Sequence, residues 1–338
     1  MDKVIRIGLD TSKHVFVVHG VDAAERPVLR RKLRRAELEP FFAKLPPLLV
    51  GLEACGGSHH WARVLARLGH EVRLLPPQYV KPYVKRGKND ARDAEAICEA
   101  VGRPTMSFVP VKSLDQQAAL MLHKARDLLL KQRTMLVNAI RGHAAELGVC
   151  APQGLGKVEA LLAQVAAEEA IPALARDVVA LLGHQLDALE HRIELVERRL
   201  LAWHRDCALS RRLATIPGIG PIAATALAMK VPDPHMFKSA RHFAAWLGLT
   251  PKDHSTAGRQ RLGGITRAGD EDLRRLLVTG ATSVIRHTKP GRGSAWLLGL
   301  IGRKPKKLAA VAWANKAARV AWAMMVNGEE YQLRVSPA

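Results

Sequence analysis

Apolar and polar residues alternate in short runs through the first hundred residues of the chain. Three apolar segments, at 4–10, 15–21 and 27–33, are separated by turn residues and predict strands joined as an antiparallel meander. The pattern that follows predicts a helix, a strand, a helix, a strand and a helix, at about 36–44, 48–53, 58–69, 70–76 and 90–101. The expected order of elements is therefore β-β-β-α-β-α-β-α.

Two long helices are predicted in the middle of the chain, at 113–148 and at about 174–206. The second carries apolar residues at alternating spacings of four and three: Leu182, Leu186, Leu189, Ile193, Val196, Leu200 and Trp203. Such a heptad seam is typical of a coiled coil. It can pack on the first long helix of the same chain or join two subunits, and we favour subunit association slightly.

Acidic residues stand where the predicted strands end. Asp10 ends the first strand and Glu53 the fourth, while Asp90 and Asp93 are three apart on a helix and share a face. Any one of these acids is explained as well by a turn or a solvated surface. Together they predict a site for Mg²⁺ or Mn²⁺, because hard cations prefer carboxylate oxygens and can act in pairs beside a phosphodiester.

The order of elements and the positions of the acids together resemble the RNase H/RuvC-like fold. We therefore expect a chain that is α/β plus all-α. Its parts are a RuvC-like domain at 1–110, long helices forming a coiled-coil linker at 111–208, and a mainly helical C-terminal domain at 209–338.

Charge points to a nucleic acid partner. The formal net charge is +21, and from Pro251 onward there are sixteen Lys and Arg against six Asp and Glu. No apolar run reaches transmembrane length and no signal peptide precedes the first strand, so we expect a cytoplasmic protein without a membrane partner. Four cations along the first long helix either contact phosphates or form an ordinary solvated face: Arg126, Lys131, Arg133 and Arg141.

The segment Leu213–Pro221, with its Pro-Gly-Ile-Gly core, is typical of a helix-hairpin-helix motif. Gly218 and Gly220 would let backbone N–H groups approach a DNA phosphate at a helix N-terminus. A plain turn between two helices is the alternative.

A glycine-punctuated basic segment follows between Trp246 and Leu277. It contains Ser255, flanked by Arg259, Arg261 and Arg267. A serine is a poor nucleophile unless it is activated, so the local chemistry alone favours an ordinary loop serine.

Long stretches of the chain resemble the DEDD transposases of bacterial insertion sequences, the family that includes Piv-type invertases and bridge-RNA-guided serine recombinases. The matching text includes GLDTSKHVFVVHGVD, GLEACGGSHHWA, QYVKPYVKRGKNDARDAEAI, ATIPGIGPIAA and AWLGLTPKDHSTAGRQRLGGITRAGDEDLRRLL. The resemblance implies that Ser255 is a nucleophile and that the metal ligands are Asp10, Glu53, Asp90 and Asp93. The family often shows a Ser-Gly or a Ser-Ser/Thr-Gly-Gly step, whereas this chain has Ser255-Thr256-Ala257-Gly258. Ala257 departs from that pattern, and Thr256 is a rival nucleophile.

The resemblance implies a DNA transposase that cuts and rejoins strands through a covalent phosphoserine with metal assistance. Its implied partners are double-stranded donor and target DNA, a structured non-coding guide RNA, and further copies of the chain in a dimer or tetramer. Two alternatives remain: a metal-only RuvC-like nuclease or strand-transferase that needs no serine, and a non-enzymatic architectural protein that binds DNA.

Overall fold

The computed structural model describes residues 4–85, 89–256, 258–288 and 294–331. The chain divides into two compact units, Met1–Gln117 and Ala118–Ala338.

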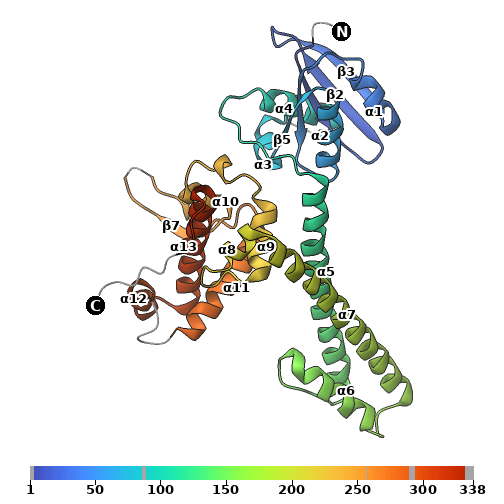
Figure 1. The fold of residues 1–338 in the computed structure, drawn as a ribbon. Coiled ribbons are helices and arrows are strands. Elements are labelled where there is room, and N and C mark those ends of the chain that lie inside the picture. Colours follow the sequence, from blue (N-terminus) through green and yellow to red (C-terminus); the bar gives the residue numbers. More distant parts are fainter. Residues whose placement is uncertain (1–3, 86–88, 257, 289–293, 332–338) are drawn as a thin grey trace. The chain divides into compact units, whose positions relative to one another are not determined.

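The first unit contains a five-stranded sheet of order β3-β2-β1-β4-β5 (Figure 1). Its strands are β1 (Arg6–Asp10), β2 (Val15–Val21), β3 (Pro27–Arg34), β4 (Leu49–Glu53) and β5 (Glu71–Leu75). The first three strands pair antiparallel, and the predicted meander is therefore confirmed. β4 runs parallel to β1 and β5 runs parallel to β4, as expected when a helix connects consecutive strands.

Helices cover both faces of this sheet. On one face, α1 (Arg35–Phe42) and α2 (Ser58–Arg67) bury an apolar cluster that includes Ile7, Leu9 and Phe16. On the other face, α4 (Asp90–Val101) packs mainly across β1 and β2 and also reaches β4, where Gly51 lies against Val101. The sequence pattern did not predict the short α3 (Pro77–Val80) or the 3₁₀ turn η1 (Lys81–Tyr83), because four residues or fewer carry no readable period.

The second unit begins with two long helices, α5 (Leu114–Glu146, whose first turn belongs to the first unit) and α7 (Ala173–Asp206). Two ion pairs show that the helices are antiparallel. Arg126 pairs with Glu197 (2.7 Å), and Arg133, seven residues later in α5, pairs with Glu190, seven residues earlier in α7. The connection contains the 3₁₀ turn η2 (Leu155–Lys157) and α6 (Val158–Ala167) (Figure 1). α6 packs with both long helices around one apolar cluster.

The heptad seam of α7 is buried within a single chain. Leu186, Leu189, Ile193 and Leu200 are each at most 6% exposed. Their burial against the chain's own helices leaves little of the seam for a second subunit. Our preference for subunit association along this seam is therefore wrong, and the alternative of internal packing holds. Assembly into a dimer or tetramer through other surfaces stays a prediction.

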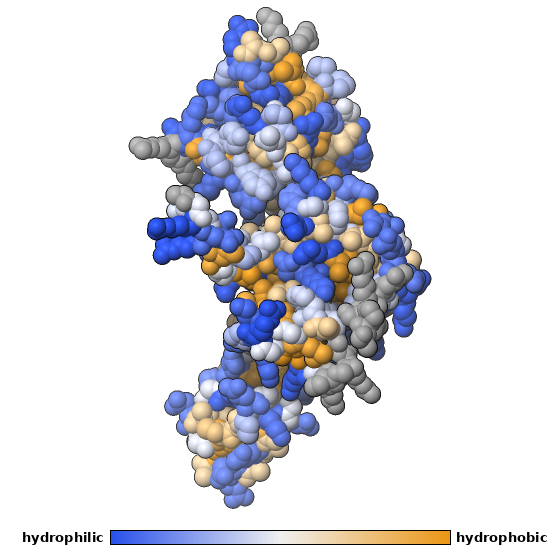
Figure 2. All heavy atoms as spheres, turned by 90° about the vertical axis from the view of Figure 1, so that its left-hand side faces the viewer, coloured by the Kyte–Doolittle hydropathy of each residue, from blue (hydrophilic) through white to orange (hydrophobic). Residues whose placement is uncertain are grey.

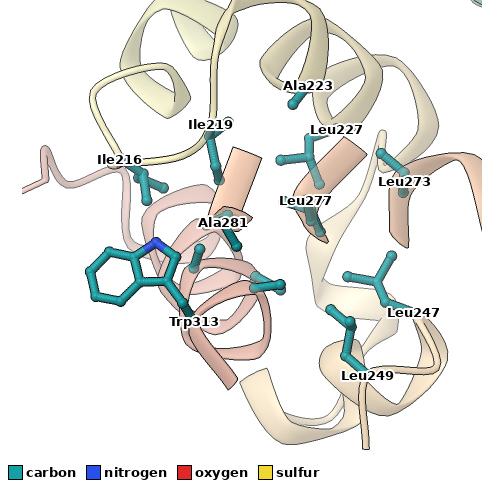
Figure 3. Close-up of a cluster of buried hydrophobic side chains, with 14 of the residues drawn as sticks. Ile216, Ile219, Ala223, Leu227, Leu247, Leu249, Leu273, Leu277, Ala281 and Trp313 are labelled. Carbon is teal, nitrogen blue, oxygen red and sulfur yellow. The ribbon is translucent and has the colours of Figure 1, made fainter. Parts of the chain in front are cut away.

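The rest of the second unit is mainly helical, as predicted. Its core contains Ile219, Leu227, Leu277 and Trp313 (Figure 3). The helices are α8 (Ala208–Leu213), α9 (Pro221–Lys230), η3 (Pro234–Met236), α10 (Ala240–Trp246), α11 (Glu271–His287), α12 (Ala295–Arg303) and α13 (Lys306–Asn327). Between α10 and α11 lies a small antiparallel hairpin that the sequence did not predict, formed by β6 (Pro251–Asp253) and β7 (Leu262–Ile265).

The loop between α8 and α9, predicted as a phosphate-binding hairpin, packs inward. Gly218 has φ +90°, and a Cβ atom built on Gly280 of α11 would lie 1.8 Å from the Gly218 carbonyl oxygen. Trp313 Nε1 donates a hydrogen bond to the Pro217 carbonyl (3.0 Å). These contacts explain the glycine at 218 by packing. Gly220, the N-cap of α9, has open space where a Cβ would stand, so phosphate contact there stays a prediction.

In the described part of the chain, no helix is both long and apolar enough to cross a membrane. Figure 2 shows the side of the second unit that carries α12 and α13, where apolar residues are exposed in patches among hydrophilic ones.

Candidate metal centre and serine hairpin

Two parallel strands end side by side with an acid each. Asp10 and Glu53 are the last residues of β1 and β4, one position beyond the Leu9–Leu52 pair. Two residues earlier each strand has a glycine, and a Cβ on Gly8 would lie 2.1 Å from the Ala94 carbonyl oxygen of α4. The missing side chain lets α4 lie directly on the sheet, on the face to which Asp10 also points.

The first turn of α4 supplies the other two acids. Asn89 caps the helix, because its side chain accepts a hydrogen bond from the Ala91 N–H (3.0 Å). Asp90 and Asp93 follow in the first turn, where carboxylates also interact favourably with the helix dipole. Carboxylate oxygens of Asp10, Asp90 and Asp93 all lie within 4.8 Å of one another, and we refer to these three residues as the acid cluster.

Electrostatics in the acid cluster favour a bound cation. Burial raises the pKa of Asp10 to about 6, and repulsion from Asp93, Asp90 and Glu53 adds to the shift. Burial, followed by repulsion from Asp93, also raises the pKa of Glu53. Glu53 lies outside the group of three closely spaced carboxylates, but it is close enough for its negative charge to raise the pKa of Asp10. A divalent cation would relieve this repulsion, and all-oxygen donors suit Mg²⁺ or Mn²⁺.

Ser255 lies in the exposed loop of the β6–β7 hairpin. Its backbone N–H donates to Asp253 Oδ1 (2.9 Å), and its Oγ accepts a hydrogen bond from the Arg261 N–H (2.9 Å). Hydrogen bonds from the Ser255 side chain and backbone lower the pKa of Asp253. The hydroxyl is therefore exposed, oriented and in contact with a carboxylate.

Thr256 occupies a different setting in the same loop. Its backbone exchanges hydrogen bonds with Arg259 across the turn, in both directions, and Ala257 lies outside the described residues. No hydrogen bond of the Thr256 hydroxyl is found within the described ranges. Of the two side-chain hydroxyl groups, that of Ser255 is therefore the one held in place by a hydrogen bond, from the Arg261 N–H.

The predicted nucleic-acid-binding cations fall into two groups. Arg259, Arg261 and Arg267 are exposed around the hairpin, as a phosphate contact requires. On α5, Arg126 and Arg133 pair with glutamates of α7, and Lys131 is exposed but pairs with Asp127.

Arg141, the last of the predicted cations on α5, binds three carbonyl groups of the following loop, those of Ala151, Pro152 and Gly154. The α5 cations thus have internal partners, and DNA contact by any of them stays a prediction.

Sequence reasoning missed two parts of the site. The first part is the glycine pair Gly8 and Gly51. Their signal in the sequence is a repeated triplet, Gly-Leu-Asp and Gly-Leu-Glu, in which each glycine precedes its acid by two residues. Asp253, the partner of Ser255, had no local signal, because its contact depends on the unpredicted hairpin.

The α/β unit carries a cluster of three carboxylates beside a fourth acid, and comparison with known proteins identifies the family. A family model described as "Transposase", of the DEDD type of IS110, matches residues 7–148, and the "Transposase IS116/IS110/IS902 family" model matches residues 210–295. The chain is 58% identical to "Putative transposase y4pF/y4sB" of Sinorhizobium fredii, over 98% of this chain and 87% of the relative.

A second relative, "Probable family 20 transposase" of Pseudomonas aeruginosa, is 50% identical over 95% of this chain and 96% of its own length. The chain therefore belongs to the IS116/IS110/IS902 family of transposases. A more distant similarity, 26% identity over 67% of this chain and 62% of the relative, connects it with the pilin gene-inverting protein of Moraxella bovis.

Proposed function

We propose that this transposase cuts and rejoins the DNA of an insertion sequence through a covalent phosphoserine formed by Ser255. The observation that carries the proposal is the meeting of Asp10 with Asp90 and Asp93, from segments about eighty residues apart in sequence. Three carboxylates at one point are costly without a cation. When bound, Mg²⁺ or Mn²⁺ would neutralise charge on a phosphodiester, and Asp10, Asp90, Asp93 and the neighbouring Glu53 would hold it.

In the proposed step, the Ser255 oxygen forms a bond to the DNA phosphorus while its proton passes to a base. We assign this role to Asp253, whose Oδ1 accepts a hydrogen bond from the Ser255 backbone N–H and whose carboxylate also interacts with the Ser255 side chain. The bond between phosphorus and one deoxyribose oxygen breaks, and that oxygen takes up a proton. The exposed guanidinium groups of Arg259, Arg261 and Arg267 are suited to hold the phosphate oxygens.

A strand-cleavage assay with four variants tests the proposal. Asp10→Asn should abolish cleavage while DNA binding persists, which separates an enzyme from an architectural DNA-binding protein. Ser255→Ala should also abolish cleavage, whereas Thr256→Ala should retain it; Ser239→Ala, a matched serine that caps α10, is the control. Full cleavage by Ser255→Ala would favour the metal-only RuvC-like alternative.

Guidance by a structured non-coding RNA is part of the proposal, supported by the family and by the net charge of +21. The charge alone does not distinguish RNA from DNA, because phosphate contacts carry no sequence information. Recombination measured with and without the transcript of the element's flanking sequence tests it. Equal activity without the transcript would rule guidance out.

A further inference from the structure

β3 forms one edge of the sheet and is strongly basic. Residues 26–35 contain six Lys or Arg and no Asp or Glu. Three of these cations alternate along the strand and are exposed: Arg30, Lys32 and Arg34. We call them the β3 cation column.

The strand register determines the face on which the column lies. Lys32 pairs with Val17, which pairs with Asp10; Arg30 pairs with His19, which pairs with Gly8. Directly paired residues of neighbouring strands project to the same face of a sheet. Gly8 contacts α4 and Asp10 joins the acids of α4, so the column projects on the face of the sheet that carries the acid cluster.

The neighbouring cation Arg31 projects to the opposite face. It pairs with Val18, which belongs to the core beneath α1, and its guanidinium lies over the Phe41 ring at 5.8 Å. The same short strand therefore carries a cation on each face, and only one face leads to the acids.

The spacing of the column suits a nucleic acid strand. Two strand separations, about 10 Å, lie between the β1 and β3 backbones, and the three cations extend over about 13 Å. That length corresponds to about four nucleotides of one DNA strand. Within the described ranges, none of the three cations forms a salt bridge, although the charge of Arg30 acts on the Glu95 carboxylate. Lys32 and Arg34 therefore keep charges that a phosphate backbone can neutralise.

Protection of a sheet edge against aggregation explains charge on β3 but not its sign. Charged side chains of either sign discourage edge pairing. Six cations without an acid, three of them on the face of the sheet that carries the acid cluster, have the complementarity expected for a phosphate backbone.

We propose that the β3 cation column binds the phosphate backbone of the DNA strand whose phosphodiester enters the acid cluster. This inference rests on the proposed function, because it takes the acid cluster as the place where DNA is cut. The column positions the strand and does not touch the reacting phosphate, so it acts on DNA affinity more than on the chemical step.

Full-length Lys32→Gln and Arg31→Gln proteins form a matched pair, with equal charge loss on opposite faces of one strand. Cleavage is measured on a duplex carrying the junction between the element and its flanking DNA, across a series of salt concentrations. Lys32→Gln should raise KM severalfold with kcat nearly unchanged and should lower the salt slope of binding by about 1. The triple variant Arg30→Gln, Lys32→Gln, Arg34→Gln should lower that slope by about 3, and Arg31→Gln should behave as the parent.

A photo-crosslinking amino acid at position 32 should label the cleaved DNA strand, and the same group at position 31 should not. Equal KM values for Lys32→Gln and Arg31→Gln, or crosslinking of position 32 to RNA in place of DNA, would overturn the inference. Asp10→Asn measured in parallel separates the two claims. Its loss of cleavage supports the proposed function even where the column fails, and its full activity contradicts the proposed function itself.

Discussion

The backbone of Gly8 in β1 lies directly against the carbonyl group of Ala94 in α4, so closely that a Cβ atom on Gly8 would stand 2.1 Å from the Ala94 oxygen. This contact fixes the distance between α4 and the sheet. That distance in turn determines whether the carboxylates of Asp90 and Asp93 reach that of Asp10.

Gly8→Ala should therefore damage the acid cluster without removing an acid. The added methyl group meets backbone atoms that cannot move aside, so α4 must shift, at a cost of about 1–3 kcal/mol in the free energy of unfolding. Mn²⁺ affinity, measured by calorimetry, should fall together with stability. Gly142→Ala is the control, because nothing lies within 4 Å of that Cβ position in α5; unchanged Mn²⁺ affinity in Gly8→Ala would contradict the role of the contact.

Ile193→Ala tests the internal role of the heptad seam. Ile193 is 4% exposed in α7, and removing a buried side chain of this size typically costs about 2–5 kcal/mol. The thermal midpoint should fall, and the size of that fall should not depend on protein concentration, because the seam lies within one chain. Leu181→Ala, at an exposed position of the same helix, should change the thermal midpoint little. A midpoint shift of Ile193→Ala that vanishes at high protein concentration would indicate a seam between subunits.

His123 should make stability depend on pH. Burial, followed by the charges of Lys230 and Arg126, lowers the pKa of His123 from its ordinary 6.5 to about 4. The unfolded chain therefore binds the proton first, and the free energy of unfolding should fall as the pH drops from 6.5 to about 4. His123→Gln should flatten this part of the profile, whereas His184→Gln, at an exposed site of α7, should leave it unchanged. An identical slope in both variants would show that His123 is not the group responsible.

Asp253→Asn should slow cleavage about 100-fold while leaving DNA binding intact. Asparagine can still accept the Ser255 N–H, but it cannot take a proton from the hydroxyl, and general-base assistance is typically worth two to four powers of ten. Asp233→Asn, which alters a similar exposed aspartate capping η3, should cleave at the parent rate. Normal single-turnover rates for Asp253→Asn would assign the carboxylate a structural role in the turn.

The sequence predicted the first unit well because its signals are local. Alternating apolar runs defined the five strands, and the acids fell at strand ends whose meeting follows from parallel pairing of β1 and β4. The short distance between Asp93 and Asp10 was harder to predict from the sequence, because it depends on the contact between Gly8 of β1 and Ala94 of α4.

The second unit was predicted less completely because its interactions are long-range. The seam of α7 has the same period whether its partner is the chain's own α5 or another subunit, so periodicity could not decide. The role of Gly218 likewise depends on Gly280, about sixty residues away. The hairpin that orients Ser255 has strands of three and four residues, too short for a pattern to show.

Mass-spectrometric mapping of a trapped protein–DNA adduct tests the central claim most directly. The full-length protein is denatured during recombination in Mg²⁺, digested with protease and nuclease, and searched for a peptide that carries a nucleotide. The account predicts a nucleotide on Ser255, absent from the Asp10→Asn protein. An adduct on Thr256, or efficient recombination with no adduct on any residue, would contradict it.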